Sequence, residues 1–132
     1  MSSRGAVVEN GHVTTEDYRI VKIVEDAKVL KGTTNKQHGL PDYAHSKNSK
    51  YIKENPDGSF REIRVYNAKG FPIFEVGYHA EKSLTGNRHE KVLHVHWFDS
   101  NFNRIMGGIV SETSNREIYL QVKKYLEAYG LL

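Results

Sequence analysis

In the stretch Val92-Leu93-His94-Val95-His96-Trp97-Phe98-Asp99, apolar and imidazole side chains alternate from Leu93 to Trp97. Because successive side chains of a β-strand point to opposite faces, this alternation predicts a strand. One face would carry His94 and His96, about 7 Å apart along the strand. The apolar side chains that share the other face are Leu93, Val95 and Trp97. The apolar face can be buried, so the functional question is what surrounds the two imidazoles.

Turn sequences and further alternating segments lie on both sides of this strand. Asn55-Pro56-Asp57-Gly58 and Asn67-Ala68-Lys69-Gly70 are typical of tight turns. The alternating segments predict strands over residues 50–53, 60–66, 71–79, 90–98 and 104–110. Short connections between consecutive strands indicate an antiparallel meander.

Segments with helical features flank the strands. Thr14 and Asp17 form a capping-box pattern, and apolar residues follow at helical spacing, which predicts a helix over residues 14–32. Its many β-branched residues leave a strand open as the alternative. Ser114-Asn115-Arg116-Glu117 begins a second predicted helix, which Gly130 ends. The predicted fold is α+β: an antiparallel meander of four to five strands, with an N-terminal and a C-terminal helix packed on one face.

The composition is that of one folded domain. The chain has 132 residues, 38% of them hydrophobic and 11% aromatic, which suffices for a single core over residues 1–132 after a loose lead-in over residues 1–13. The absence of cysteine excludes disulfides and thiolate metal sites. No apolar run reaches the roughly 18 residues of a membrane helix, and the first residues lack a signal-peptide core. The sequence therefore predicts a soluble cytoplasmic protein with no membrane partner.

Positive charge is concentrated in one segment of a nearly balanced chain. The 19 Lys and Arg residues exceed the 16 Asp and Glu residues by only three. Residues 31–48 are rich in glycine and polar side chains and predict a basic loop, with Asp42 as its only acidic residue. This loop is either a solvated connection or an arm that binds a phosphate backbone. The predicted backbone contacts in and after the loop are His45, Lys47, Lys50 and Lys53.

Strand alternation places a polar set on the face that carries the imidazoles. If Ile63 and Val65 point to the core, the side chains between them point the other way. The outward set on three neighbouring strands is predicted to be Arg64, Tyr66, Glu75, His79, His94 and His96. Because both helices are expected on the opposite face, this face is expected to be open to solvent. Gly77 would then let a substrate backbone approach the sheet.

The outward set can perform acid–base chemistry on a phosphodiester. A metal-independent ribonuclease needs a base for the 2′-hydroxyl proton and an acid for the departing 5′-oxygen. His94 or His96 would fill one role, and His79 or Glu75 the other. Arg64 would hold the extra charge on phosphorus, and Tyr66 would stack on a base. We expect no cofactor, because the chain contains neither a P-loop nor G-x-G-x-x-G.

Other interpretations of the histidines stay open. Paired histidines on a strand are often ordinary solvent-facing residues. His-x-His is also a metal-ligand spacing, although no second signature such as H-E-x-x-H accompanies it. The third ligand would be His79, His89, Glu75 or Asp99. The same face would also suit a non-catalytic phage or host interaction protein, for example an inhibitor of a bacterial defence system.

Several motifs follow one another in a distinctive order between Gly39 and Asp99. They are Gly39-Leu40-Pro41, Arg64-Val65-Tyr66-Asn67-Ala68-Lys69-Gly70, Tyr78-His79 and His94-Val95-His96-Trp97. In this order the segment resembles small C-terminal domains of bacterial polymorphic toxins and related phage-encoded proteins, several of which look like barnase-like ribonucleases. The resemblance implies an N-terminal helix and an antiparallel sheet with the active site on its open face.

The same resemblance implies a catalytic set and partners. The catalytic set that it carries over is His79, His94, His96 and Arg64. RNA would be the substrate, and an immunity or defence protein a partner. Together with the residue chemistry, the resemblance predicts a toxin-like, metal-independent endoribonuclease.

Overall fold

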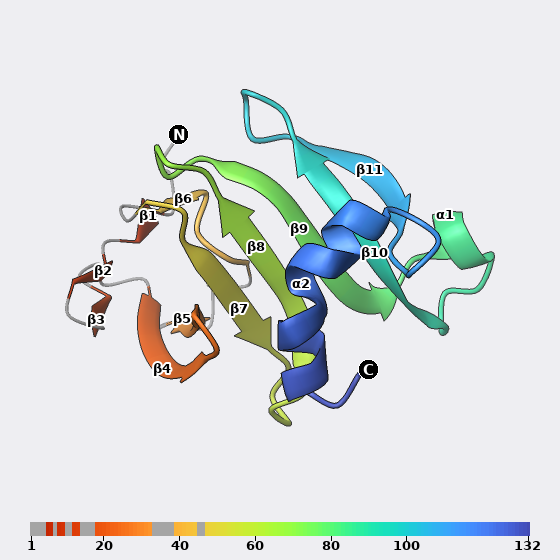
Figure 1. Cartoon of the computed structure of the whole chain (residues 1–132), viewed down its shortest axis with the longest axis horizontal. Helices are drawn as coiled ribbons and strands as arrows, with labels where there is room; N and C mark the ends of the chain where they lie inside the picture. The colour runs from red at the N-terminus through yellow and green to blue at the C-terminus, as the bar shows by residue number, and fades with distance from the viewer. Residues whose placement is uncertain (1–4, 7, 10–11, 14–17, 33–38, 45–46) are drawn as a thin grey trace.

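A computed structural model of the chain describes residues 5–6, 8–9, 12–13, 18–32, 39–44 and 47–132. Its centre is a seven-stranded sheet in the order β11-β10-β9-β8-β7-β5-β4 (Figure 1). The strands are β4 (Tyr18–Val24), β5 (Ala27–Gly32), β7 (Lys50–Glu54), β8 (Phe60–Tyr66), β9 (Pro72–Ala80), β10 (Lys91–Phe98) and β11 (Arg104–Ile109). All neighbours are antiparallel except β5 and β7, which pair in parallel.

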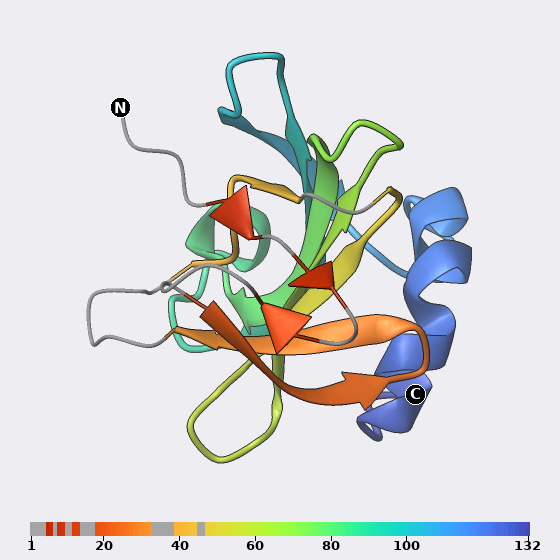
Figure 2. The same cartoon turned by 90° about the vertical axis from the view of Figure 1, so that its left-hand side faces the viewer.

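Shorter elements lie on both sides of this sheet. The helix α2 (Arg116–Ala128) covers one face, and the one-turn helix α1 (Lys82–Thr85) lies on the opposite side (Figure 2). The remaining elements are the two-residue strands β1 (Gly5–Ala6), β2 (Val8–Glu9), β3 (His12–Val13) and β6 (Tyr43–Ala44). β1 pairs with β6, and β2 pairs with β3.

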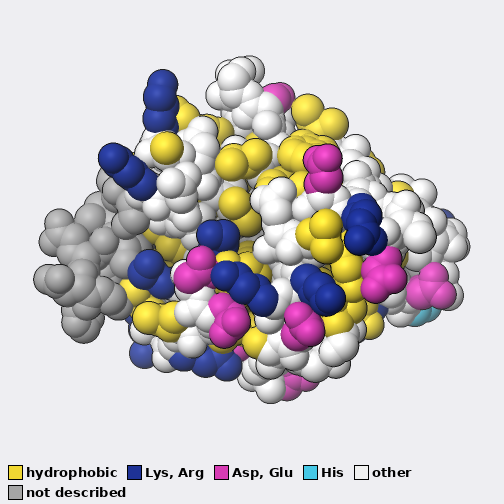
Figure 3. Space-filling model, viewed as in Figure 1, with side chains coloured by type: hydrophobic (Ala, Val, Ile, Leu, Met, Phe, Trp, Pro, Cys, Tyr) yellow, Lys and Arg dark blue, Asp and Glu magenta, His cyan; other side chains and the backbone are white. Residues whose placement is uncertain are grey.

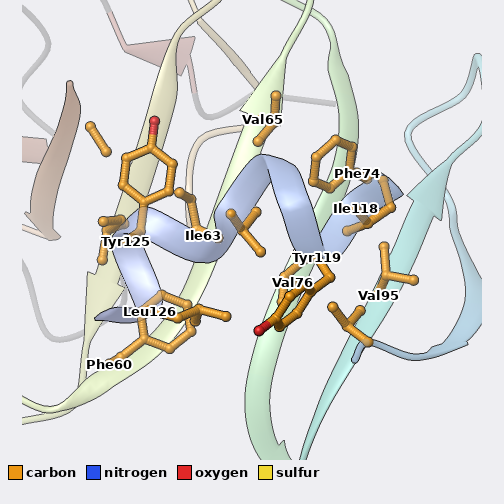
Figure 4. Packing of buried hydrophobic residues seen from close by; sticks show 14 of the residues in the cluster. Phe60, Ile63, Val65, Phe74, Val76, Val95, Ile118, Tyr119, Tyr125 and Leu126 are labelled. Carbon is orange, nitrogen blue, oxygen red and sulfur yellow. The ribbon is translucent and has the colours of Figure 1, made fainter. Parts of the chain in front are cut away.

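The main core lies between α2 and the sheet (Figure 4). One stripe of α2 is buried because its apolar residues recur at helical spacing, and it contributes Ile118, Tyr119, Val122, Tyr125 and Leu126. Alternate residues of the sheet meet this stripe, among them Ile63, Val65, Phe74, Val76 and Val95. Each fully buried aliphatic side chain here contributes about 1.5–3 kcal/mol of hydrophobic stabilisation.

A second apolar cluster covers part of the opposite face. It consists of Tyr18, Leu30, Leu40, Ala44, Tyr51 and Tyr66. Leu40 and Ala44 come from residues 39–44, which therefore pack over the sheet on the side away from α2. The prediction that this face is open to solvent is wrong where this segment lies, because two buried side chains of the predicted loop cover it.

The meander and the C-terminal helix were predicted correctly, whereas the N-terminal helix was not. Strands β7 to β11 confirm the predicted segments, each end within one residue. The described part of residues 14–32 is the β4–β5 hairpin, which raises the sheet from the predicted four or five strands to seven. β-Branched residues favour a strand there, and Glu25 turns the chain in the left-handed region (φ 55°).

The start of α2 is tied to the sheet differently from the predicted capping box. Asn115 adopts a left-handed conformation and makes no side-chain cap hydrogen bond. Its Nδ2 instead donates to the carbonyl oxygens of Gly107 and Ile109 in β11. The helix is therefore tied to β11 through its N-cap residue.

The surface on the α2 side carries mixed charges. Figure 3 shows basic and acidic side chains interspersed there, without a large patch of one sign. Such a surface offers no continuous electrostatic path for a phosphate backbone. Among the described residues, no helix is long and apolar enough to span a membrane.

Asp26 in the β4–β5 turn links the hairpin to α2. It accepts hydrogen bonds from the Tyr125 hydroxyl and from Lys50 Nζ (3.3 Å), and Lys124 Nζ lies 3.4 Å away. Burial alone would raise the pKa of Asp26, but these donors and cations outweigh it and lower the pKa to about 2. The carboxylate form is thus bound more tightly in the folded state than in the unfolded chain.

We expect Asp26→Asn to destabilise the protein at pH 7 and not at strongly acidic pH. The pKa is lower in the folded state, so the contribution is complete above about pH 4 and disappears as the pH falls towards 2. Because the side chain is 54% exposed, solvent screening limits the loss to on the order of 1 kcal/mol. Urea unfolding between pH 7 and pH 3, in a double-mutant cycle with Tyr125→Phe, measures it. A difference that stays constant over this range would contradict the assignment.

Candidate functional site

The register of the sheet brings the predicted polar residues onto one face. Arg64 in β8 pairs with Glu75 in β9, and Glu75 pairs with His96 in β10. Two residues further along β9, Gly77 pairs with His94. His79 is two residues beyond Gly77 and shares this face by alternation. These side chains occupy the face opposite α2, as the strand alternation predicts.

Arg64 is buried in this face and is not an accessible cation. Its side chain is 3% exposed. Nε and Nη2 donate to Glu75 Oε1 at 3.0 and 2.8 Å, while Nη1 donates to the carbonyl oxygens of Leu40 (3.2 Å) and Pro41 (3.0 Å). The Phe98 ring lies 4.8 Å from the guanidinium carbon. Arg64 therefore joins the 39–44 segment to the sheet, and the expected exposed phosphate clamp is wrong.

Tyr66 is also buried, contrary to the expectation of an exposed stacking residue. Its ring packs against Tyr51 at a centroid distance of 5.0 Å, and its hydroxyl donates to the carbonyl oxygen of Pro41. Only 1% of the residue is exposed, so no RNA base can reach the ring. The same covering segment explains the burial of Tyr66 and Arg64.

Two carboxyl groups lie side by side next to Arg64. Burial raises the pKa of Glu62, and the hydrogen bond with Glu75 and its negative charge raise it further. Burial alone would also raise the pKa of Glu75, but the hydrogen bond from Glu62 and the charges of Arg64 and Arg104 lower it instead. The two carboxyls therefore titrate as a coupled pair, in which the pKa of Glu62 is raised and that of Glu75 is lowered. Glu75 is an ionised partner of two arginines and is not an accessible base.

Three imidazoles form a row at the other end of this face. The His94 ring lies edge-on to both neighbours, with centroids 4.5 Å from His79 and 5.1 Å from His96. His94 is fully buried, whereas the two outer rings are half-buried. Solvent can therefore reach the outer histidines but not the central one.

Backbone carbonyls set the orientation of two of these rings. His94 Nδ1 lies 2.8 Å from the carbonyl oxygen of Val92, and His79 Nδ1 lies 3.3 Å from that of Ala80. Since a carbonyl only accepts, Nδ1 is the donor in both rings. In the neutral tautomer this leaves a lone pair on Nε2 of each.

Gly77 provides the space that the rings occupy. A Cβ at this position would lie 2.8 Å from His79 Nε2 and 3.5 Å from His94 Cε1. Any side chain at residue 77 would therefore displace His79. Gly77 was expected to admit a substrate backbone, but two imidazoles fill that place.

The outer imidazoles are shifted towards their neutral forms. Burial lowers the pKa of His79, and His94 and Arg61 lower it further against the opposing Ala80 hydrogen bond. Burial likewise lowers the pKa of His96, with smaller contributions from His94 and Arg104. Both rings therefore offer a lone pair at neutral pH.

Glu81 belongs to the cluster but was not predicted. Its Oε2 lies 3.8 Å from His94 Nε2, and one ligand atom each of His79, Glu81 and His94 lie within 4.8 Å of one another. Glu81 directly follows β9, so it lies outside the alternating strand pattern. Its position two residues after His79 was the available signal.

The other candidate third ligands are engaged elsewhere. His89 Nε2 accepts from Arg88 Nε, and Asp99 accepts from the backbone N–H groups of Asn101 and Asn103. Glu75 is bound by Arg64 and Arg104. Within the described part of the chain, the one cluster with metal-ligand geometry is that of His79, Glu81 and His94.

Arg104 is an accessible cation that the sequence reasoning missed. Its Nη2 lies 3.1 Å from Glu75 Oε2, and its side chain is 48% exposed. His96 pairs with Met106 and Val95 with Gly108, so Gly107 is an extra residue in β11. Without this bulge Ile105, not Arg104, would share the histidine face. The Gly107-Gly108 pair was the sequence signal for the bulge.

The predicted phosphate contacts do not form one arm. Lys50 pairs in register with Val65, whose side chain faces α2, and it binds Asp26. Lys53 is half-buried opposite Glu62, and Lys47 is exposed in the turn before β7. His45 lies outside the described residues. Lys50 is therefore on the wrong face to guide a strand to the histidines.

Comparisons with protein-family models, curated proteins and solved structures returned no match. The resemblance to toxin-associated domains therefore stays a prediction from motifs. What is known of the site rests on its own geometry.

We expect Arg64→Ala to destabilise the fold far more than Arg104→Ala, although both arginines bind Glu75. Removal of Arg64 takes two donors from the buried Glu75 carboxylate and takes one donor each from the carbonyls of Leu40 and Pro41, which costs about 3–5 kcal/mol. Removal of the half-exposed Arg104 breaks a solvent-screened pair and costs below about 1 kcal/mol. Urea unfolding of both variants measures the difference. Equal losses would show that Arg64 does not hold the 39–44 segment in place.

Proposed function

We propose that the protein cleaves RNA by histidine acid–base catalysis on the β9–β10 part of the sheet. One half-buried outer imidazole, His96 or His79, takes the proton of a 2′-hydroxyl, and the 2′-oxygen attacks phosphorus. The bond from phosphorus to the 5′-oxygen breaks, and the other outer imidazole, in its protonated form, gives that oxygen a proton. The products are a 2′,3′-cyclic phosphate and a 5′-hydroxyl. As the sequence predicts, these steps need no metal.

The observation that supports this proposal is the row of three imidazoles with accessible outer members. His94 is too buried to contact a substrate. It acts as a positioning residue, because its ring packs in T-shaped contacts against the rings of His79 and His96. The outer rings are half-buried and their pKa values are lowered towards the neutral form, which suits the imidazole that acts as the base. A toxin-like ribonuclease thus remains the function that the site supports best.

Arg104 replaces Arg64 as the proposed phosphate contact. It is half-exposed and lies close enough to lower the pKa of His96. Arg61, beside Glu62 (Nε to Oε1, 3.7 Å), acts similarly on His79. The carboxylates that act against these cations near the outer histidines are Glu75 and Glu81. A phosphodiester between the outer histidines would meet the half-exposed guanidinium of Arg104.

We expect His96→Ala to lower the rate of RNA cleavage by about 10²–10⁴-fold, the usual effect of losing a general acid or base. The assay follows a fluorescent single-stranded RNA in EDTA, with product termini identified by mass spectrometry. His89→Ala, which removes an exposed histidine outside the row, is the matched control and should cleave like the wild type. Arg104→Ala should lose about tenfold or more.

Two results would count against the enzyme. Absence of cleavage by the wild type, or equal cleavage by the wild type and His96→Ala, would remove the proposal. In the first case the same face would be tested as a binding surface, by size-exclusion chromatography with candidate defence proteins. A stable stoichiometric complex that tolerates single histidine substitutions would support the non-catalytic alternative.

A further inference from the structure

We propose that His79, Glu81 and His94 form a binding site for one divalent transition-metal ion of the zinc type. Two imidazole nitrogens and one carboxylate oxygen would bind the ion. The proposed ribonuclease mechanism uses no metal. The ligand sets that the sequence suggested as an alternative did not contain Glu81, so this site is new. Metal binding can be measured without RNA, so the test of this site does not depend on whether the protein cleaves RNA.

The first support is a polar atom that the fold leaves without a partner. His94 is fully buried, and its Nε2 has no hydrogen-bond partner among the described residues. An unsatisfied buried polar group costs about 1–3 kcal/mol. The Glu81 carboxylate lies 3.8 Å from this nitrogen, too far for a hydrogen bond. A cation between them would satisfy both groups.

The second support is the preparation of the two rings. Nδ1 of His94 donates a hydrogen bond to the carbonyl oxygen of Val92, and Nδ1 of His79 donates to that of Ala80. Nε2 of each ring is therefore left for another partner. Metal-binding histidines usually carry such a hydrogen bond on the ring nitrogen that does not bind the ion. Gly77 leaves the space in which His79 Nε2 approaches His94. The orientation of both rings is therefore already set by the backbone.

The donor distances suit a small ion after limited movement. The three ligand atoms lie within 4.8 Å of one another. Ligands of tetrahedral zinc, at about 2.0–2.2 Å from the metal, are about 3.3 Å apart. The half-buried His79 and Glu81 can supply this adjustment, whereas His94 is held by its surroundings. Three protein ligands leave a fourth position open to water.

The ligand types select the class of ion. Imidazole nitrogen with one carboxylate suits zinc, cobalt and nickel, whereas magnesium and calcium prefer all-oxygen sites. Glu81 is the one negatively charged group among the three ligands, because both of the other ligands are imidazoles. Its carboxylate therefore supplies the negative charge that attracts the ion. Loss of this carboxylate should therefore weaken metal binding strongly.

The site overlaps the proposed proton-transfer pair at His79. A metal on His79 would occupy the lone pair that cleavage uses. If the proposed function holds, zinc should inhibit cleavage reversibly, and EDTA should restore it. Activation by zinc would refute the metal-free mechanism while leaving the site intact, so the two proposals fail separately.

The test titrates the full-length, EDTA-stripped protein with zinc chloride at pH 7 in an isothermal calorimeter. We expect one equivalent to bind, and magnesium chloride not to compete. Glu81→Gln and Gly77→Ala should each weaken binding by about tenfold or more, the first by removing a ligand and the second by displacing His79. Glu90→Gln and His89→Ala are the matched controls and should bind like the wild type.

Circular dichroism of each variant shows whether it is folded. The two test positions are chosen because neither removes the buried His94, whose loss could unfold the core. Gly77 needs no left-handed backbone, so the alanine there perturbs the rings and not the strand. Absence of saturable binding, or equal zinc affinity in wild type, Glu81→Gln and Gly77→Ala, would overturn the site.

Discussion

The buried ion pair between Arg64 and Glu75 is the interaction on which the histidine face depends. A guanidinium that is 3% exposed must place its donors on acceptors, and Arg64 uses one carboxylate and the carbonyls of Leu40 and Pro41. Those carbonyls belong to residues 39–44, so one side chain from the middle of the sheet fixes the segment that covers it. The described part of the chain thus buries Arg64 and Tyr66 in the covered half and leaves His79 and His96 half-buried in the β9–β10 half.

The strands were predictable because their side chains alternate and typical turn sequences separate them. The same reasoning failed for residues 14–32, where apolar side chains lie at spacings that fit either period. Val21 and Ile23 are exposed in β4, so the apolar residues there do not mark one buried face. In that case the β-branched residues were the better guide, since they favour extended backbone. The position of this hairpin in the sheet is set by the parallel pairing of β5 with β7. No local sequence pattern encodes that pairing.

The face of each polar strand residue was predictable, but its exposure was not. Alternation tells which side chains share a face with His94 and cannot tell whether a loop covers that face. Here the cover comes from Leu40, Pro41 and Ala44, which show no periodic pattern. Arg104 was missed for a related reason: one extra glycine in β11 reverses the alternation between His96 and the end of the strand.

Gly77 connects the stability of the sheet with the site. A glycine inside a central strand costs conformational entropy and packs no side chain, so it weakens the strand. In this sheet the missing side chain admits the rings of His79 and His94, and it brings His94 Nε2 into a buried position without a hydrogen bond. Both features lower stability if the rings are only packing residues. A cation held between these imidazoles and Glu81 would offset this cost, because a ligand that binds only the folded state stabilises that state.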